Sequence, residues 1–383
     1  MKTRICFMSL LFAVTALSCQ EMILGPDKVN QPLPLQYTSR LATLLDSMRY
    51  ALDLPALAGA IVTDTSIIDA QAVGCRRYGG PANVTSNDQF HLGSCGKSFT
   101  SVVIGTLVDQ GLVQWTTTLP EIFPEYSGTM RAEYRDVNIL NILSHSAGFM
   151  RDPNLTLHST TPKDRRAEVV AWALLQPPVV PRGTELYSNL GFVIAGAITE
   201  KLTNRPYEDL VVEKVIRPLG ITTAGFGQMG TEGLEDEPLQ HSPNHAPIVA
   251  TPDAHLLDIE NSAGGLHMSI GDWGRYCRWV LACEAGRPTL LNGATARTIT
   301  TPYVIMDARG GGSALGWGVE YWDAVGGRIL GHTGSNGFNY AQVLLVPDRH
   351  FGIVVMTNQG SGTVSNPIWP VVVRLIQLYQ NGK

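Results

Sequence analysis

The segment "HLGSCGKSFTSVVIGTL" (residues 91–107) contains a serine, Ser94, three positions before a lysine, Lys97. The chain has only 7 lysines in 383 residues, and this one precedes an apolar run. Apolar residues in the run recur at helical spacing, so the segment predicts a buried helix. Residues three apart on a helix share a face, which places Ser94 and Lys97 one turn from each other.

This pair suits nucleophilic catalysis. A serine hydroxyl is a weak nucleophile until a base takes its proton. A buried lysine loses the solvation of its charged form, so its pKa falls and its amine can act as that base. A helix-capping serine followed by a lysine whose head reaches water has the same spacing. The segment alone leaves both interpretations open, because S-x-x-K is a short motif.

Two later segments add polar residues in a particular order. "ELYSNLGF" supplies Tyr187 and Asn189, and "GHTGSNG" supplies His332, Thr333 and Gly334 at the edge of a predicted strand. The order S-x-x-K, Y-x-N, H-T-G resembles that of the penicillin-recognising serine hydrolases. The resemblance is closer to the class C β-lactamase-like family, in which tyrosine replaces the serine of the second motif.

Further segments extend the resemblance over about residues 38–380, namely "NILSHSAGF", "PYEDLVVEKVIRPLGITTAGFG", "SAGGLHMSIGDWGRY" and "ALGWGVEYW". The resemblance implies that Ser94 is a nucleophile that forms an acyl-enzyme. It implies that Lys97 is the general base for Ser94, or shares that proton with Tyr187. Tyr187 would also protonate the leaving group and later activate the deacylating water. Asn189 would hold Lys97 and bind a substrate amide.

The third motif is implied to bind the substrate. The backbone N–H groups of Ser94 and Ser335 would form an oxyanion hole, in which each donor typically contributes ~3 kcal/mol. Gly334 has no side chain, so we expect substrate to lie against that strand. His332 and Thr333 would face a carboxylate or an amide of the substrate.

His332 departs from the lysine of the familiar β-lactamases of this class. A histidine is mostly neutral at pH 7 and is a weaker anchor for a carboxylate. We therefore expect a serine hydrolase that acts on a small ester or amide, which includes simple esters, D-amino-acid peptides and, weakly, β-lactams. The alternative is a catalytically inactive cell-surface binding protein on the same scaffold, since a fold does not fix a function.

The pattern of strands and helices predicts an α/β (α+β) fold. Both ends of the chain would build an antiparallel sheet flanked by helices, with an all-α domain inserted, as in the β-lactamase/transpeptidase-like fold. Amphipathic spacing predicts a helix over 37–53, and residues 58–74 read as two strands around a turn. The expected division is an α/β domain formed by 37–114 and 266–383, with a mainly helical domain at 115–265.

Other residues could carry chemistry. Cys95 could be a nucleophile, but no histidine partner is evident for it. Ser146 in "LSHSAGF" nearly matches the hydrolase elbow, but it follows a helical pattern and enters a loop, and we expect His145 beside it to be an interior histidine.

The segment "HSPNHAPIVATPDAH" offers a possible zinc site, although its prolines break any helical face. Its candidate ligands are His241, His245, Asp253 and His255. We expect a rim of the substrate cleft instead, and no metal or cofactor. The glycine-rich "RGGGS" (309–313) lacks the lysine of a phosphate loop and is expected to be a flexible loop.

The N-terminus predicts export. A short positive region and an apolar core of signal-peptide length end in "ALSC", which resembles a bacterial lipoprotein box. We favour residues 1–19 as a signal peptide with Cys19 as the lipidated residue over ordinary cleavage near Ser18, and 20–36 as a linker. The protein would then be periplasmic or a membrane-anchored lipoprotein of a bacterium, with this anchor as its one membrane contact.

Composition limits the partners. A net charge of −5 without a basic block argues against nucleic-acid binding, which leaves a small-molecule or peptide substrate as the expected partner. The sequence leaves the oligomeric state open. Four cysteines outside the N-terminal segment fit no metal or redox motif, and we expect them to be small buried residues. They are Cys75, Cys95, Cys277 and Cys283.

Overall fold

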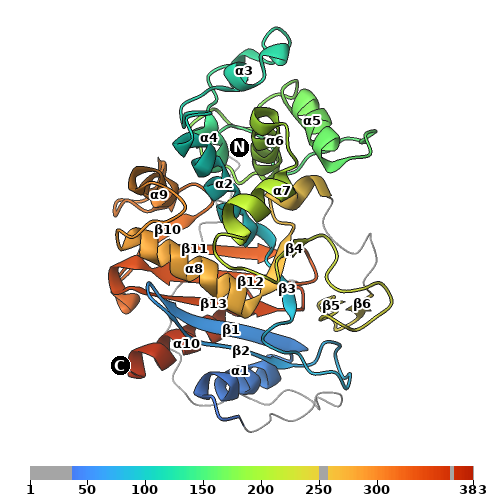
Figure 1. The fold of residues 1–383 in the computed structure, drawn as a ribbon, viewed down its shortest axis with the longest axis vertical. Helices are drawn as coiled ribbons and strands as arrows, with labels where there is room; N and C mark the ends of the chain where they lie inside the picture. The colour runs from blue at the N-terminus through green and yellow to red at the C-terminus, as the bar shows by residue number, and fades with distance from the viewer. Residues whose placement is uncertain (1–36, 250–257, 363–365, 383) are drawn as a thin grey trace, which may run out of the picture.

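The computed structural model describes residues 37–249, 258–362 and 366–382. An eight-stranded sheet crosses the middle of the molecule, and every pair of neighbouring strands in it is antiparallel (Figure 1). In spatial order its strands are β2 (Ile67–Gly74), β1 (Ala56–Thr63), β13 (Phe351–Thr357), β12 (Tyr340–Val346), β11 (Gly327–Ser335), β10 (Gly318–Trp322), β9 (Gly312–Ser313) and β8 (Val304–Ile305). The antiparallel sheet with flanking helices confirms the predicted fold class.

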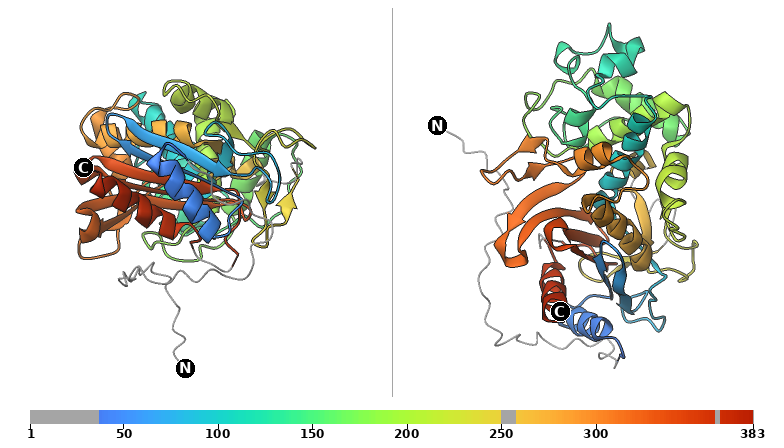
Figure 2. Two further views of the ribbon diagram at one scale, coloured as in Figure 1. Left: turned by 90° about the horizontal axis from the view of Figure 1, so that it is seen from below. Right: turned by 60° about the vertical axis from the view of Figure 1, so that its left-hand side comes forward.

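Helices cover both faces of the sheet. Helices α1 (Arg40–Ala51) and α10 (Trp369–Asn381) pack side by side on one face (Figure 2), and α8 (Ile270–Glu284) packs on the other. Strands β12 and β13 are buried along their whole length, since apolar residues on both of their faces enter a core. Helix α1 confirms the predicted helix over 37–53, and β1 and β2 confirm the two strands predicted in 58–74.

The remaining helices gather beyond one end of the sheet, at the top of Figure 1. They are α3 (Leu119–Ile122), α4 (Ile139–Leu143), α5 (Pro162–Ala173), α6 (Asn189–Thr203) and α7 (Tyr207–Val211), with the π-helical turn η4 (Val212–Ile216) and the 3-10 turns η2 (Pro124–Tyr126), η3 (Ala132–Tyr134) and η5 (Asp258–Ser262). Helix α2 (Lys97–Asp109) packs against α6 and α9 (Gly293–Thr300). One apolar core runs from the sheet into these helices, and the division into two domains stays a prediction.

Short strands complete the structure. A three-stranded sheet joins β3 (Gln89–His91), β7 (Leu266–Ser269) and β4 (Gly225–Phe226), and β5 (Gln240–His241) pairs with β6 (Pro247–Ile248). The 3-10 turns are η1 (Gly93–Gly96), η6 (Asp323–Val325) and η7 (Pro347–Arg349).

The prediction of a loop over 309–313 is wrong for Gly312 and Ser313. These two residues form β9, which pairs with β8 on one side and with β10 on the other. The prediction considered only composition, whereas here the neighbouring strand supplies backbone partners for a glycine-rich segment.

The predicted signal peptide, the Cys19 anchor and the linker lie outside the described residues. Within the part of the chain that the structure describes, no helix is both long and apolar enough to span a membrane.

Candidate active site

Ser94 and Lys97 meet where the 3-10 turn η1 continues into helix α2. Ser94 lies in η1 and Lys97 is the first residue of α2. Lys97 Nζ lies 3.1 Å from Ser94 Oγ. The one-turn spacing expected from the sequence thus brings an amine within hydrogen-bond distance of the hydroxyl.

The Lys97 amine is fully buried, with 0% of the residue exposed. It donates hydrogen bonds to Asn189 Oδ1 at 2.7 Å and to the carbonyl oxygen of Ala263 at 2.6 Å. Both of these oxygens can only accept, so they hold two N–H bonds in either protonation state of the amine. The third substituent position of the Lys97 nitrogen therefore faces Ser94 Oγ. This position carries an N–H bond when Lys97 is an ammonium ion and a lone pair when it is a neutral amine.

The environment of Lys97 favours the neutral amine. Burial lowers its pKa to about 7, and the positive charge of Arg151 adds to this effect, while the carboxylate of Glu260 opposes it. The rings of Tyr187 and Phe192 lie with their centroids 5.0 and 5.3 Å from Nζ. About half of the Lys97 side chains are then uncharged at neutral pH and able to accept the Ser94 proton.

The pKa of Tyr187 is shifted in the opposite direction to that of Lys97. Burial raises the pKa of its phenol, and a hydrogen bond with the Ser94 hydroxyl offsets only part of that rise. The phenol therefore keeps its proton at neutral pH. Between the two bases that the sequence leaves open, this arrangement favours Lys97 as the group that takes the Ser94 proton and Tyr187 as a proton donor.

Asn189 is the first residue of helix α6, whose N-cap is Ser188. Its side-chain oxygen accepts from Lys97, and its Nδ2 donates to Asp152 Oδ1 at 2.7 Å. The expected contact with Lys97 is therefore present. The expected contact of Asn189 with a substrate amide stays a prediction.

Strand β11 contains the H-T-G motif and lies against the turn that carries Ser94. A Cβ atom added to Gly334 would lie 1.9 Å from the carbonyl oxygen of Leu92 and 2.8 Å from the backbone nitrogen of Ser94. A Cβ atom on Gly93 would lie 2.2 Å from the nitrogen of Ser335. The missing side chains allow η1 and β11 to touch, which makes the N–H groups of Ser94 and Ser335 neighbours.

This contact corrects the expected reason for Gly334. The sequence suggested that the glycine leaves room for substrate, but the space of its side chain is filled by η1. The glycine is needed for the close approach of two backbone segments. The side chain of Ser335 is also occupied, because its Oγ donates to the carbonyl oxygen of Asn339 at 2.7 Å and accepts from the N–H of Gly337.

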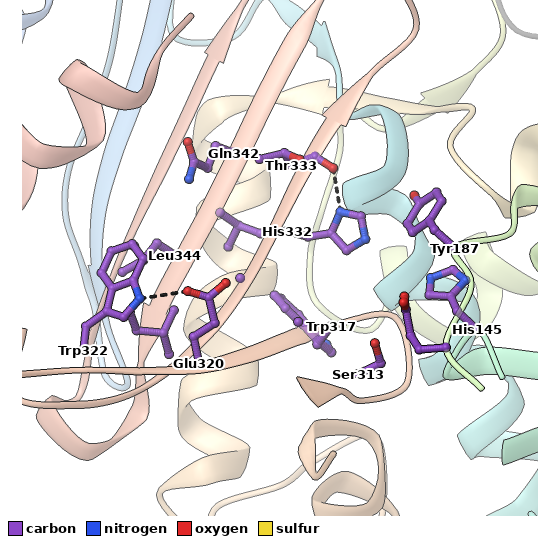
Figure 3. A pocket seen from close by; sticks show the side chains of 15 residues that line it. His145, Tyr187, Ser313, Trp317, Glu320, Trp322, His332, Thr333, Gln342 and Leu344 are labelled. Carbon is purple, nitrogen blue, oxygen red and sulfur yellow. Dashed lines mark hydrogen bonds between the residues drawn. The ribbon is translucent and has the colours of Figure 1, made fainter. Parts of the chain in front are cut away.

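His332 and Thr333 line a pocket together with Tyr187 and His145 (Figure 3). Burial, together with the charge of Lys97, lowers the pKa of His332 to about 4. Burial likewise lowers the pKa of His145 well below its usual value. Both imidazoles are therefore neutral at pH 7, so His332 offers no positive charge to a carboxylate.

The two competing nucleophiles do not have catalytic surroundings. Cys95 is buried, its Sγ lies 3.5 Å from the carbonyl oxygen of His332, and burial raises the pKa of its thiol. Ser146 follows helix α4 and is buried, with its Oγ 3.0 Å from Ser144 Oγ. His145 is an interior histidine, as expected, whose Nδ1 accepts from the N–H of Ser188. Its ring also lies tilted against that of Tyr187, with the centroids 4.4 Å apart, which the sequence did not suggest.

The suggested zinc ligands have other partners. His241 lies between the carbonyl oxygen of Asn358 and the N–H of Tyr78, and His245 Nε2 lies 2.8 Å from the carbonyl oxygen of Asp53. Asp253 and His255 lie outside the described residues. Across 37–249, 258–362 and 366–382, no group of three histidine, cysteine or acidic residues is placed to hold a metal ion. The four cysteines named above are free thiols.

Several contributors to the site were missed in the sequence, Arg151 among them. Ala263 acts through its backbone oxygen, which no side-chain motif can reveal. Asp152 and Glu260 lie in segments without a recognisable motif, yet one binds Asn189 and the other raises the pKa of Lys97.

Comparison with known proteins agrees with this arrangement. The family model described as Beta-lactamase matches residues 41–378. Penicillin-binding protein 4 of Amycolatopsis lactamdurans is 26% identical over 335 residues, which cover 83% of this chain and 84% of that protein. The unguisins hydrolase ungD' of Aspergillus campestris (strain IBT 28561) is 26% identical over 295 residues and 72% of this chain, but this chain spans only 53% of its length.

A solved structure shares the fold. The class C β-lactamase of Rhodobacter sphaeroides superposes with a TM-score of 0.68 at 19% identity, over 88% of this chain and 97% of that one. At this identity the similarity concerns the fold alone.

Proposed function

Because the chain belongs to the Beta-lactamase family, we propose that it is a serine hydrolase that cleaves a small ester or amide through an acyl-enzyme on Ser94. The observation that carries this proposal is the environment of Lys97. A buried amine held by two carbonyl oxygens, with its third position directed at Ser94 Oγ, is suited to accept a proton.

The proposed reaction proceeds in two stages. Neutral Lys97 takes the proton of Ser94, and Ser94 Oγ attacks the substrate carbonyl carbon. The N–H groups of Ser94 and Ser335 stabilise the oxyanion. As the bond to the leaving group breaks, Tyr187 gives its proton to that group and recovers one from Lys97. Water then attacks the acyl-enzyme, its proton passes to the Tyr187–Lys97 pair, and Ser94 is released as a hydroxyl.

Export is part of the proposal and rests on the signal-like segment at residues 1–19. In that case the enzyme works in the periplasm or, through Cys19, at a bacterial membrane surface. The substrates considered are simple esters, D-amino-acid peptides and, weakly, β-lactams. Among the relatives, the names of a penicillin-binding protein and of a hydrolase support this range.

Active-site labelling tests the proposal. A fluorophosphonate and a fluorescent penicillin should be incubated with the purified protein, and the modified peptide located by mass spectrometry. An adduct on Ser94 with either reagent supports the enzyme. Absence of any adduct, under conditions that label a control serine hydrolase, would favour the inactive binding protein.

The pH dependence should follow Lys97. Its amine is protonated below a pKa of about 7 and cannot then take the Ser94 proton. We expect kcat/KM for an ester to rise about tenfold per pH unit below that value and to level off above it. Burial keeps the Tyr187 phenol protonated across this range, so no fall in kcat/KM from loss of this proton donor is expected below about pH 9. A flat profile between pH 5 and 8 would contradict Lys97 as the base.

Tyr187→Phe should slow two proton transfers, the one to the leaving group and the one from the deacylating water. General acid–base contributions are typically ~10²-fold or more, so we expect turnover to fall by about that factor. A chromogenic ester should give a burst followed by a slow steady state, with the acyl-enzyme visible by intact-mass spectrometry. Tyr321→Phe, on β10, is the matched control. A steady state equal to that of the unmodified enzyme would remove Tyr187 from the reaction.

A further inference from the structure

A pocket of about 240 Å³ opens beside the candidate catalytic residues. At one end it is lined by His145, Tyr187 and His332, and at the other by Glu320 and Trp322 of strand β10 (Figure 3). Since Tyr187 forms a hydrogen bond with Ser94, a substrate held in this pocket would have its reacting bond within reach of the nucleophile. The chemistry of the pocket should therefore select the substrate.

The charged groups of the pocket are all acidic. Glu185 and Glu320 contribute carboxylates, and no lysine or arginine is among the lining residues that the structure describes. The two lining histidines are neutral at pH 7, because burial lowers the pKa of both. A substrate carboxylate would meet these two acidic groups inside the pocket. The cations Lys97 and Arg151 do not line it, although they lie 5.0 and 5.2 Å from the centroid of the Tyr187 ring at one end of it.

Glu185 has no hydrogen-bond or ion-pair partner among the described residues. The residue is half-buried and lines the pocket. Burial raises the pKa of this carboxyl, because the protein solvates its charged form less well than water does. A cation entering the pocket would relieve that cost.

Glu320 is held by a hydrogen bond from Trp322. Trp322 Nε1 donates to its Oε2 at 2.8 Å, and this contact orients the carboxylate at the end of the pocket shown in Figure 3. Trp317 lines the same pocket. Aromatic rings and carboxylates in one pocket both attract organic cations, through the ring quadrupole and through the negative charge.

We propose that the substrate carries an ammonium group, and that this pocket, with Glu185 and Glu320 as its acidic groups and Trp317 and Trp322 in its lining, binds that group. The inference rests on the proposed function, since it names the substrate class of the same site. It predicts a preference for cationic esters or amides over neutral isosteres and over substrates with a carboxylate at this position.

Isosteric substrates test the preference. Butyrylthiocholine and S-(3,3-dimethylbutyl) thiobutyrate differ only in a positive nitrogen against a carbon, so they compare the leaving-group side. The p-nitrophenyl esters of 4-(trimethylammonio)butanoic and 5,5-dimethylhexanoic acids compare the acyl side. In at least one pair we expect kcat/KM of the cationic member to exceed that of the neutral member by about tenfold, the effect of ~1.4 kcal/mol. A ratio near one in both pairs would overturn the proposal.

Charge-neutral variants locate the subsite. Glu320→Gln and Glu185→Gln should each lower the cationic-to-neutral ratio, and the double variant should bring it close to one. Glu232→Gln is the matched control, because Glu232 is exposed and does not line the pocket. An unchanged ratio in the double variant would also overturn the proposal.

A binding measurement separates this inference from the proposed function. If no ester is hydrolysed and Ser94 is not labelled, the proposed function fails. Choline chloride is then titrated at constant ionic strength while tryptophan fluorescence is recorded. A saturable change that is lost in Glu320→Gln but kept in Glu232→Gln would support the cation subsite. No saturable change would overturn it.

Discussion

Replacing Lys97 with methionine should reduce ester turnover by at least about 10⁴-fold, and Ser94→Ala should do the same, because members of a catalytic unit act together. Methionine keeps most of the buried volume and removes the proton acceptor 3.1 Å from Ser94 Oγ. The measurement is kcat/KM on a short acyl ester, together with the rate of labelling by a fluorophosphonate. The double variant should be no slower than either single variant.

The fold should survive these changes. Lys97 is buried, so removing its amine removes a poorly solvated charge, although Asn189 and the Ala263 carbonyl lose a donor. Lys163→Met is the matched control, because its amine lies on the surface and binds Asn204. Near-normal turnover of folded Lys97→Met and Ser94→Ala proteins would end the proposal of catalysis through Ser94.

The polar side chains of the site could be predicted from the sequence, because short motifs identify them. The S-x-x-K, Y-x-N and H-T-G motifs predicted which side chains would meet, and Lys97, Tyr187, Asn189 and His332 do lie together. Strands such as β12 and β13 were predictable as well, because their apolar runs are too short for helices and rich in β-branched residues.

The remainder of the site arises from tertiary contacts. The pKa of Lys97 falls because α6 and the loop that contains Ala263 enclose it, and no local pattern specifies that enclosure. The pairing of Gly312 and Ser313 in β9 depends on strands on either side of them. Glu185 stands two positions before Tyr187 in the sequence, yet only its place in the pocket and its lack of a partner among the described residues single it out.

The neutral His332 and the acidic pocket both bear on whether the site accepts a substrate with a carboxylate. With lysine in its place, a carboxylate would have a cationic anchor, whereas this site offers two glutamates and uncharged imidazoles. We therefore expect robust hydrolysis of β-lactams, which carry a carboxylate, to be absent in this protein.

Gly334→Ala should impair acylation by about 10³-fold, the effect of disturbing the donors of an oxyanion hole. The added Cβ would lie 1.9 Å from the Leu92 carbonyl oxygen and 2.8 Å from the Ser94 nitrogen. Both neighbours are backbone atoms, so η1 must move away from β11. The N–H groups of Ser94 and Ser335 would then separate, while the Lys97 amine keeps its carbonyl partners.

This variant distinguishes a packing role of Gly334 from the substrate-clearance role that the sequence suggested. If the glycine only made room for substrate, a small fluorophosphonate would still label Ser94 at the normal rate and KM for larger esters would rise. If it holds η1 against β11, labelling itself should slow, with a lower melting temperature. Gly271→Ala in α8 is the control, because a Cβ there meets nothing within 4 Å. Normal labelling of a folded Gly334→Ala protein would contradict the packing role, because it would mean that the added Cβ does not disturb the oxyanion donors.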